Sequence, residues 1–96
     1  MSSSSVEARA IRVGLVEDDE GIRASLGDII GRSKTCQVVC SCGDGETALS
    51  ALIQGQPEVV LMDINLPGMN GIECVRQLKQ RLPSAQVIML DRKSVV

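Results

Sequence analysis

Short apolar runs alternate along the chain with stretches in which apolar residues recur every three or four positions. The runs predict four strands, since short runs rich in β-branched residues are typical of strands buried on both faces. They span residues 11–16, 37–40, 59–63 and 87–90. The stretches between them predict three helices, because residues three and four apart share one helical face. These faces consist of Ile22, Leu26, Ile29 and Ile30; of Ala48, Leu49, Leu52 and Ile53; and of Ile72, Val75, Leu78 and Leu82.

The strict alternation of strand and helix predicts an α/β fold with an open parallel sheet and right-handed crossovers. Each predicted helix ends at glycine or proline, namely at Gly31, at Gly55 with Pro57, and at Pro83. A chain of 96 residues makes one domain at most. We expect residues 1–10 to form a disordered leader, because they contain four consecutive serines and little to bury.

Acidic residues follow two of the predicted strands directly. Glu17, Asp18, Asp19 and Glu20 come after the first strand, and Asp63 ends the third. The carboxyl ends of parallel strands share one edge of the sheet, where open α/β sheets keep their ligand crevices. If the first and third strands are neighbours, both groups of carboxylates meet in one pocket.

The negative charge of such a pocket must be compensated, because like charges about 4 Å apart repel by roughly 4 kcal/mol at an effective dielectric near 20. Protons or a cation can supply it, and oxygen ligands with open positions suit Mg²⁺. A carboxylate beside Mg²⁺ can attack a phosphoryl group and carry it as an acyl phosphate. The spacing alone leaves open whether this chemistry occurs.

Composition narrows the function classes. The chain has no histidine, which excludes histidine-based triads and histidine-ligated zinc. It has no aromatic residue for base stacking, and its net charge of −2 argues against general nucleic-acid binding by this segment. The four cysteines are interpreted as small buried hydrophobes in a reducing cytoplasm. No apolar run approaches the roughly 20 residues of a membrane span.

Two motifs carry a family resemblance. The segment 16–19, Val-Glu-Asp-Asp, together with the segment 61–71, Leu-Met-Asp-Ile-Asn-Leu-Pro-Gly-Met-Asn-Gly, resembles the receiver domain of bacterial two-component response regulators. The resemblance covers residues 11–90 and implies the flavodoxin-like doubly wound fold. It implies that Asp63 is the phosphoacceptor. It also implies a Mg²⁺ site made of Glu17, Asp18, Asp63 and the backbone carbonyl of Asn65.

The same resemblance assigns further roles. Pro67 and Gly71 would shape the loop beside the phosphorylation site. The sequences of residues 45–49 and 71–76 are similar to those of LuxR-type regulators, which carry a C-terminal helix-turn-helix. The implied protein is therefore a cytoplasmic switch and not a turnover enzyme. A sensor histidine kinase would phosphorylate it, DNA would be bound only through an output domain absent from this chain, and the full-length protein could dimerise.

The chain also departs from the family pattern. Receivers continue after the fourth strand with a helix, a fifth strand and another helix, so the fold is expected to be C-terminally incomplete. Asp91 stands where a threonine or serine is expected, and no lysine follows a fifth strand. We expect residues 91–96 to be a non-native tail, because a common sequencing adapter can encode them. Losing the fifth strand would leave residues 87–90 as an apolar edge, and the fragment marginally stable and prone to aggregate.

Other interpretations fit fewer residues. The pattern Gly43-x-Gly45-x-x-Ala48 is compatible with a dinucleotide-binding Rossmann fragment, although the acids at 17–19 would repel a pyrophosphate. A haloacid-dehalogenase-type phosphatase would need an acid at Asn65, and no P-loop motif is present. The acids could simply cap helices and turns, which explains one or two carboxylates. A non-functional truncated fragment is the remaining alternative.

Overall fold

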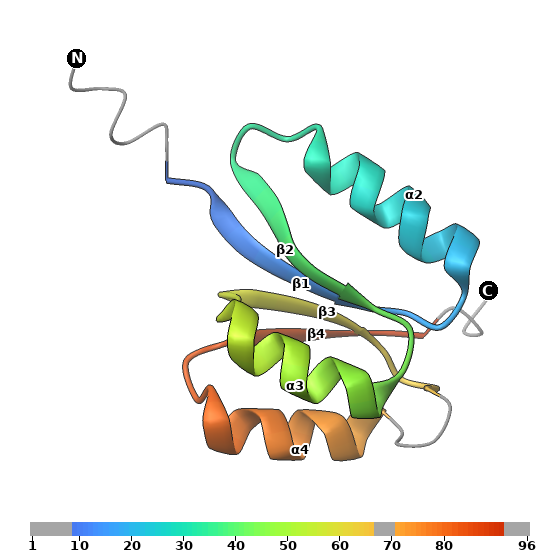
Figure 1. Cartoon of the computed structure of the whole chain (residues 1–96), viewed down its shortest axis with the longest axis vertical. Helices are drawn as coiled ribbons and strands as arrows, with labels where there is room; N and C mark the ends of the chain where they lie inside the picture. Colours follow the sequence, from blue (N-terminus) through green and yellow to red (C-terminus); the bar gives the residue numbers. More distant parts are fainter. Residues whose placement is uncertain (1–8, 67–70, 92–96) are drawn as a thin grey trace.

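The computed structural model describes residues 9–66 and 71–91 as a parallel sheet with helices on both faces (Figure 1). All the predicted strands and helices are present, which confirms the α/β prediction. The second strand is longer than predicted, and the fourth starts one residue earlier. In chain order the elements are β1 (Ile11–Val16), α2 (Glu20–Gly31), β2 (Cys36–Cys42), α3 (Gly45–Gly55), β3 (Val59–Asp63), α4 (Gly71–Arg81) and β4 (Gln86–Leu90).

The strand order in the sheet is β2-β1-β3-β4, and every neighbouring pair is parallel. The first and third strands are therefore neighbours, as the convergence of the two acidic groups requires. In their shared register Val16 lies opposite Met62. A register shift between Val13 and Gly14 interrupts the pairing of β1 with β2.

The hydrophobic core lies between the sheet and the layer formed by α3 and α4, which pack side by side (Figure 1). Its buried residues are Val16, Cys42, Ala48, Leu52, Val60, Met62, Leu66, Cys74 and Leu78. The helix α2 packs on the opposite face, against β2 and β1. No residue of α2 is fully buried, and Ile29 is 64% exposed. Apolar burial is thus concentrated on one face of the sheet.

Side chains cap the helices that begin at the carboxyl edge of the sheet. Asp19 caps α2 by accepting a hydrogen bond from the Ile22 amide at 2.9 Å. Asp44 caps α3 in the same way, accepting from the Thr47 amide at 2.7 Å. Helix α3 ends at Gly55 as expected, but the left-handed residue is Gln56, with φ of 53°. Among the described residues no helix has the length and apolarity needed to cross a membrane.

Three sequence predictions fall wholly or largely outside the described ranges. Residues 1–8 of the expected leader and residues 92–96 of the expected tail lie there, as does Pro67. Arg9, at the end of the expected leader, forms an ion pair with Glu58 at 3.2 Å. The disordered leader and the non-native tail stay predictions.

Candidate functional site

Three carboxylates converge at the carboxyl edge of the sheet. Glu17 and Asp18 follow β1 directly, and Asp63 is the last residue of β3. One oxygen from each lies within 4.8 Å of the others. Glu17 and Asp63 are each 1% exposed, whereas Asp18 is exposed to solvent. The site therefore combines two buried acids with one that is exposed to solvent.

Backbone hydrogen bonds hold Glu17 in this position. Its amide donates to the carbonyl of Cys42 at 3.0 Å, which ties the end of β1 to the end of β2. Its carboxylate oxygen Oε2 accepts from the Asp19 amide at 2.9 Å. Asp19 itself is the helix cap. Capping thus explains Asp19, whereas Glu17 and Asp18 belong to the cluster with Asp63.

The turn after β3 orients Asp63. Its carboxylate oxygen Oδ1 accepts a hydrogen bond from the Asn65 amide at 3.0 Å, which restricts rotation of the carboxyl group. The next helix begins close by, since the Gly71 amide donates to the Ile64 carbonyl at 3.1 Å. A Cβ on Gly71 would lie 2.6 Å from the Asp63 carbonyl oxygen. Glycine is needed here because backbone occupies the space of a side chain. The carbonyl of Asn65 as a metal ligand stays a prediction.

The donor set fits a hard divalent cation. It consists of oxygen atoms only, and two of the three acids are removed from water. Two like charges about 4 Å apart repel by roughly 4 kcal/mol at an effective dielectric near 20, so a bound cation would relieve a substantial repulsion. Because Mg²⁺ keeps several waters and is bound by few carboxylates, the open side near Asp18 suits it. The residues present therefore fit a Mg²⁺ site.

A comparison with protein families shows which family this chain belongs to. The family model of the response regulator receiver domain matches residues 13–95. The chain belongs to this family. This membership disfavours the Rossmann interpretation, because the acidic residues at the ends of β1 and β3 then belong to a receiver. It also confirms the two-component response regulator prediction and the flavodoxin-like receiver fold.

Individual relatives agree. The transcriptional regulatory protein DegU of Brevibacillus brevis is 34% identical over 90% of this chain and 36% of its own length. The DNA-binding transcriptional activator DevR/DosR of Mycobacterium tuberculosis is 34% identical over 83% of this chain and 37% of its own length. The chain thus spans little more than a third of these relatives. A protein-glutamate methylesterase/protein-glutamine glutaminase of Thermotoga maritima is 38% identical over 86% of this chain and 24% of its own length.

Solved structures give the same fold. The response regulator domain of Thermotoga maritima CheB superposes with a TM-score of 0.82 and 37% identity, covering 86% of this chain and 61% of that one. The receiver domain of the NarL regulator of Mycobacterium tuberculosis has a TM-score of 0.83 at 23% identity, covering 91% and 70%. At that identity the second likeness concerns the fold alone.

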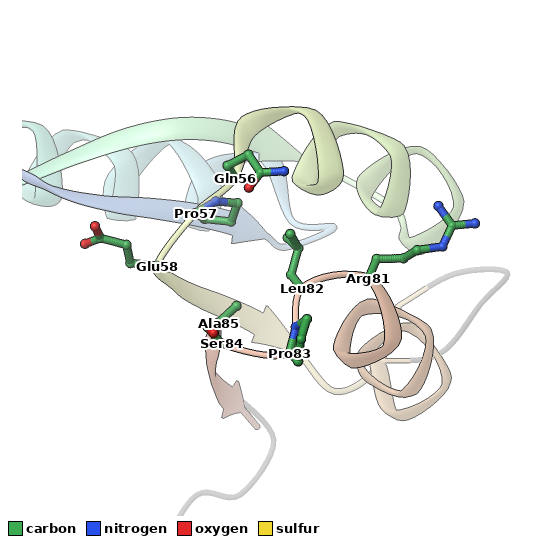
Figure 2. Close-up of a pocket in the computed structure, with 8 residues that line it drawn as sticks. All are labelled: Gln56, Pro57, Glu58, Arg81, Leu82, Pro83, Ser84 and Ala85. Carbon is green, nitrogen blue, oxygen red and sulfur yellow. The ribbon is translucent and has the colours of Figure 1, made fainter.

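A hollow of about 320 Å³ lies at the opposite edge of the sheet (Figure 2). It is lined by Gln56, Pro57, Glu58, Arg81, Leu82, Pro83, Ser84 and Ala85. Glu58 precedes β3 and Ala85 precedes β4, so the hollow sits at the amino ends of these strands. It is therefore remote from the carboxylates, at the edge where parallel sheets rarely bind ligands.

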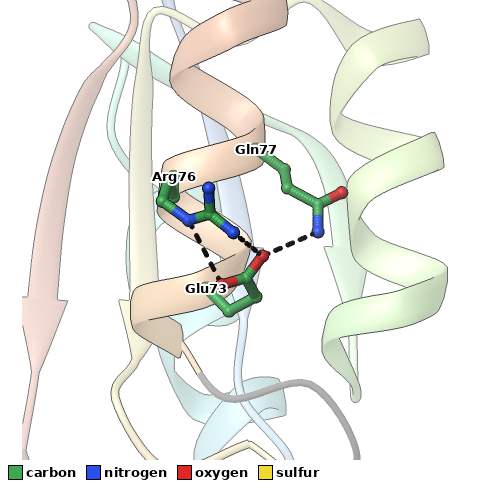
Figure 3. A network of polar contacts seen from close by, with 3 residues as sticks. All are labelled: Glu73, Arg76 and Gln77. Atoms are coloured by element: carbon green, nitrogen blue, oxygen red, sulfur yellow. Dashed lines mark hydrogen bonds and ion pairs between the residues drawn. The ribbon is translucent and has the colours of Figure 1, made fainter.

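The polar network on α4 is a surface feature (Figure 3). Glu73 accepts hydrogen bonds from Gln77 at 3.0 Å and from Arg76 at 2.6 Å. These bonds, that from Gln77 foremost, lower the pKa of Glu73 below its usual value. Exposed pairs of this kind add little stability. The network supports the first turns of α4.

The four cysteines are free thiols. Cys42 and Cys74 are buried, as predicted, while Cys36 and Cys40 are only partly so. Burial raises the pKa of Cys40 to about 11, with a further contribution from Cys42. Burial likewise raises the pKa of Cys42 and of Cys74. Because the thiolate is the reactive form, the raised pKa values make the thiols of Cys40, Cys42 and Cys74 poor nucleophiles.

The sequence did not point to Arg23. This residue lies on α2, and its Nη1 donates to the carbonyl oxygen of Glu17 at 2.7 Å. A separation of six residues across a turn and a helix start is not a spacing that predicts contact. The only signal available in the sequence was a cation close to an acidic motif.

Proposed function

We propose that Asp63 is the phosphoacceptor of this receiver domain and that a histidine kinase supplies its phosphoryl group. The observation that carries the proposal is the convergence of Glu17, Asp18 and Asp63 within 4.8 Å, in a chain that belongs to the receiver family. Asp63 is the member of this cluster at the end of β3, where the turn holds its carboxyl group through the Asn65 amide.

In this proposal a carboxylate oxygen of Asp63 attacks phosphorus, the bond from phosphorus to the donor's nitrogen breaks, and an acyl phosphate forms on Asp63. Glu17, Asp18, Asp63 and the carbonyl of Asn65 would hold Mg²⁺. The cation would neutralise charge between the carboxylates and the incoming phosphoryl oxygens. Burial of Asp63 limits access, so the phosphodonor would approach from the open side beside Asp18.

We further infer that the protein acts in the cytoplasm as a transcriptional switch. Phosphorylation would shift a two-state equilibrium and so control an output domain. Names of relatives support a DNA-binding output, since DegU and DevR/DosR are transcriptional regulators. A methylesterase output is the second candidate, because the Thermotoga relative carries that name. The gene sequence downstream of the codon for Leu90 separates the two.

The direct test is labelling of the chain with radioactive acetyl phosphate in the presence of Mg²⁺. We expect hydroxylamine-labile label that is lost in Asp63→Asn and on addition of EDTA. Asp28→Asn is the matched control, since Asp28 is an exposed acid on α2 paired with Arg32. Label that persists in Asp63→Asn would contradict the assignment. A chain that binds Mg²⁺ but takes no label would favour the non-functional alternative.

A further inference from the structure

Arg23 reaches back from α2 over the loop that carries the acidic pair. Its guanidinium nitrogen Nη1 donates to the carbonyl oxygen of Glu17 at 2.7 Å, in a partly buried position. Its own amide donates to the carbonyl of Asp19 at 2.9 Å, within the first turn of the helix. One residue thus connects the start of α2 to both ends of the acidic segment.

The Glu17 carbonyl belongs to the peptide that joins Glu17 to Asp18. Its orientation therefore sets the directions in which the two carboxylates leave the backbone. Two other hydrogen bonds fix the same segment. The Glu17 amide donates to the Cys42 carbonyl, and the Asp19 amide donates to the Glu17 carboxylate. The bond from Arg23 is charge-assisted, as is the bond from the Asp19 amide to the Glu17 carboxylate, and such bonds are roughly twice as strong as neutral ones.

Gly43 provides the space for this contact. A Cβ built on Gly43 would lie 2.9 Å from Nη1 of Arg23 and 4.0 Å from the Glu17 carbonyl oxygen. The nearest neighbour is the end of a long flexible side chain, so an added methyl group would displace the guanidinium and leave the backbone in place. The glycine after β2 thus leaves the space that the arginine on α2 needs to reach the Glu17 carbonyl.

We propose that Arg23, in the space left by Gly43, is a positioning residue for the divalent-cation site. The proposal rests on the proposed function, because it assumes that Glu17 and Asp18 hold the cation. Partners that orient metal ligands typically change metal affinity by about 10–100-fold when they are removed. The positive charge of Arg23 acts in the opposite sense, since it repels a cation. Variants that conserve charge separate the two effects.

The test uses Arg23→Lys, Gly43→Ala and the double variant in the 96-residue chain. The first change keeps the charge but loses the guanidinium, and the second keeps Arg23 but displaces it. Arg32→Lys is the matched control on the same helix, where Arg32 is 77% exposed and pairs with Asp28. The dissociation constant for Mg²⁺ is measured by calorimetry and that for Mn²⁺ by electron paramagnetic resonance. Thermal unfolding is followed by circular dichroism.

We expect Arg23→Lys and Gly43→Ala each to weaken cation binding about tenfold, the lower end of the range for such partners. The double variant should be no weaker than Arg23→Lys alone, because both changes remove the same contact. Arg32→Lys should bind as the parent does. Labelling of Asp63 at saturating Mg²⁺ should be retained in all four variants.

Unchanged affinity in both single variants would overturn the proposal, as would an equal loss in Arg32→Lys. Independent, multiplying losses in the double variant would also overturn it. Each of these outcomes leaves the phosphoacceptor proposal intact, provided that the parent chain binds Mg²⁺ and that Asp18→Asn, measured alongside, does not. If the parent chain binds no Mg²⁺, or if Asp18→Asn binds it as tightly as the parent does, the cation site and this inference are overturned together.

Discussion

Val16 and Met62 lie opposite each other in the parallel pair of β1 and β3. The residues that follow them, Glu17 and Asp63, therefore leave the sheet at the same level and at adjacent positions. Asp18 comes one residue later and is exposed to solvent. This single register explains why acids 46 positions apart in the chain share one pocket.

Asp63→Asn should stabilise the chain when Mg²⁺ is absent. The change removes one negative charge from the cluster, and asparagine can still accept the hydrogen bond from the Asn65 amide. We expect a gain of about 1–4 kcal/mol in the free energy of unfolding, the range that two like charges 4 Å apart span between water and a dielectric near 20. Urea unfolding followed by circular dichroism measures it. Asp28→Asn should not show this gain.

Mg²⁺ should stabilise the parent chain and have little effect on Asp63→Asn. A ligand that binds only the folded state adds about 2.7 kcal/mol at a concentration one hundred times its dissociation constant. The measurement is the midpoint of thermal unfolding across a Mg²⁺ titration, with EDTA as the reference condition. Equal shifts in the two proteins would show that the cation binds elsewhere.

Gly71→Ala should destabilise the fold by about 1–3 kcal/mol, the usual cost of adding volume where none is available. The added methyl would meet the Asp63 carbonyl oxygen at 2.6 Å and the Ile64 Cα at 2.9 Å, so backbone must move. The control is Gly31→Ala at the end of α2, where a Cβ meets nothing within 4 Å. Denaturant midpoints of the two variants give the comparison, and a similar effect of both would argue against the crowding.

Asp44 should make part of the stability depend on pH. Hydrogen bonds from the Thr47 amide and hydroxyl lower the pKa of Asp44 below its ordinary value of 3.8. The stabilising contribution is therefore complete above about pH 4 and is lost as pH falls through the lowered pKa. Asp44→Asn keeps the cap without the titration. The difference in urea midpoint between parent and variant should shrink or reverse as pH falls from 5 to 2.

Cys40 should react slowly with thiol reagents in the folded protein. With a pKa of about 11, only about one thiol in a thousand is ionised at pH 8. We expect the rate of modification by iodoacetamide, followed by mass spectrometry, to rise with pH up to about that value. Unfolding in urea should remove the protection. Fast modification of Cys40 at pH 8 in the native chain would contradict the burial that raises its pKa.

The exposed edge strand should promote self-association. In the described part of the chain β4 pairs only with β3, and Ile88 and Met89 are 50% and 37% exposed. Unpaired apolar edges favour pairing with another chain, and an inserted lysine discourages it. Sedimentation velocity should show less association for Ile88→Lys than for the parent. Ile72→Lys, at a 64% exposed position on α4, should have a smaller effect.

The order of the elements and the centre of the site could be predicted from the sequence. Short apolar runs predicted the strands, and apolar residues three and four positions apart predicted the helices, because side-chain direction follows from local backbone geometry. The acids at the ends of two strands and the motif around Asp63 were therefore readable along the chain. The exact ends of the helices and strands were harder to predict from the sequence. Helix α3 ends at Gly55 as predicted, but the left-handed residue that follows it is Gln56, a residue type that does not indicate this conformation in a sequence.

Which elements are neighbours does not follow from periodicity: the family resemblance implied an arrangement with residues 87–90 at an edge, and the tertiary structure shows it. The order β2-β1-β3-β4 brings Glu17 beside Asp63, and local periodicity contains no information on that order. It also brings the end of β2 to the start of α2, where Gly43 makes room for Arg23 against the Glu17 carbonyl. Such contacts join residues whose separation in sequence carries no signal, and they exist only once burial of the apolar faces has packed helices onto the sheet.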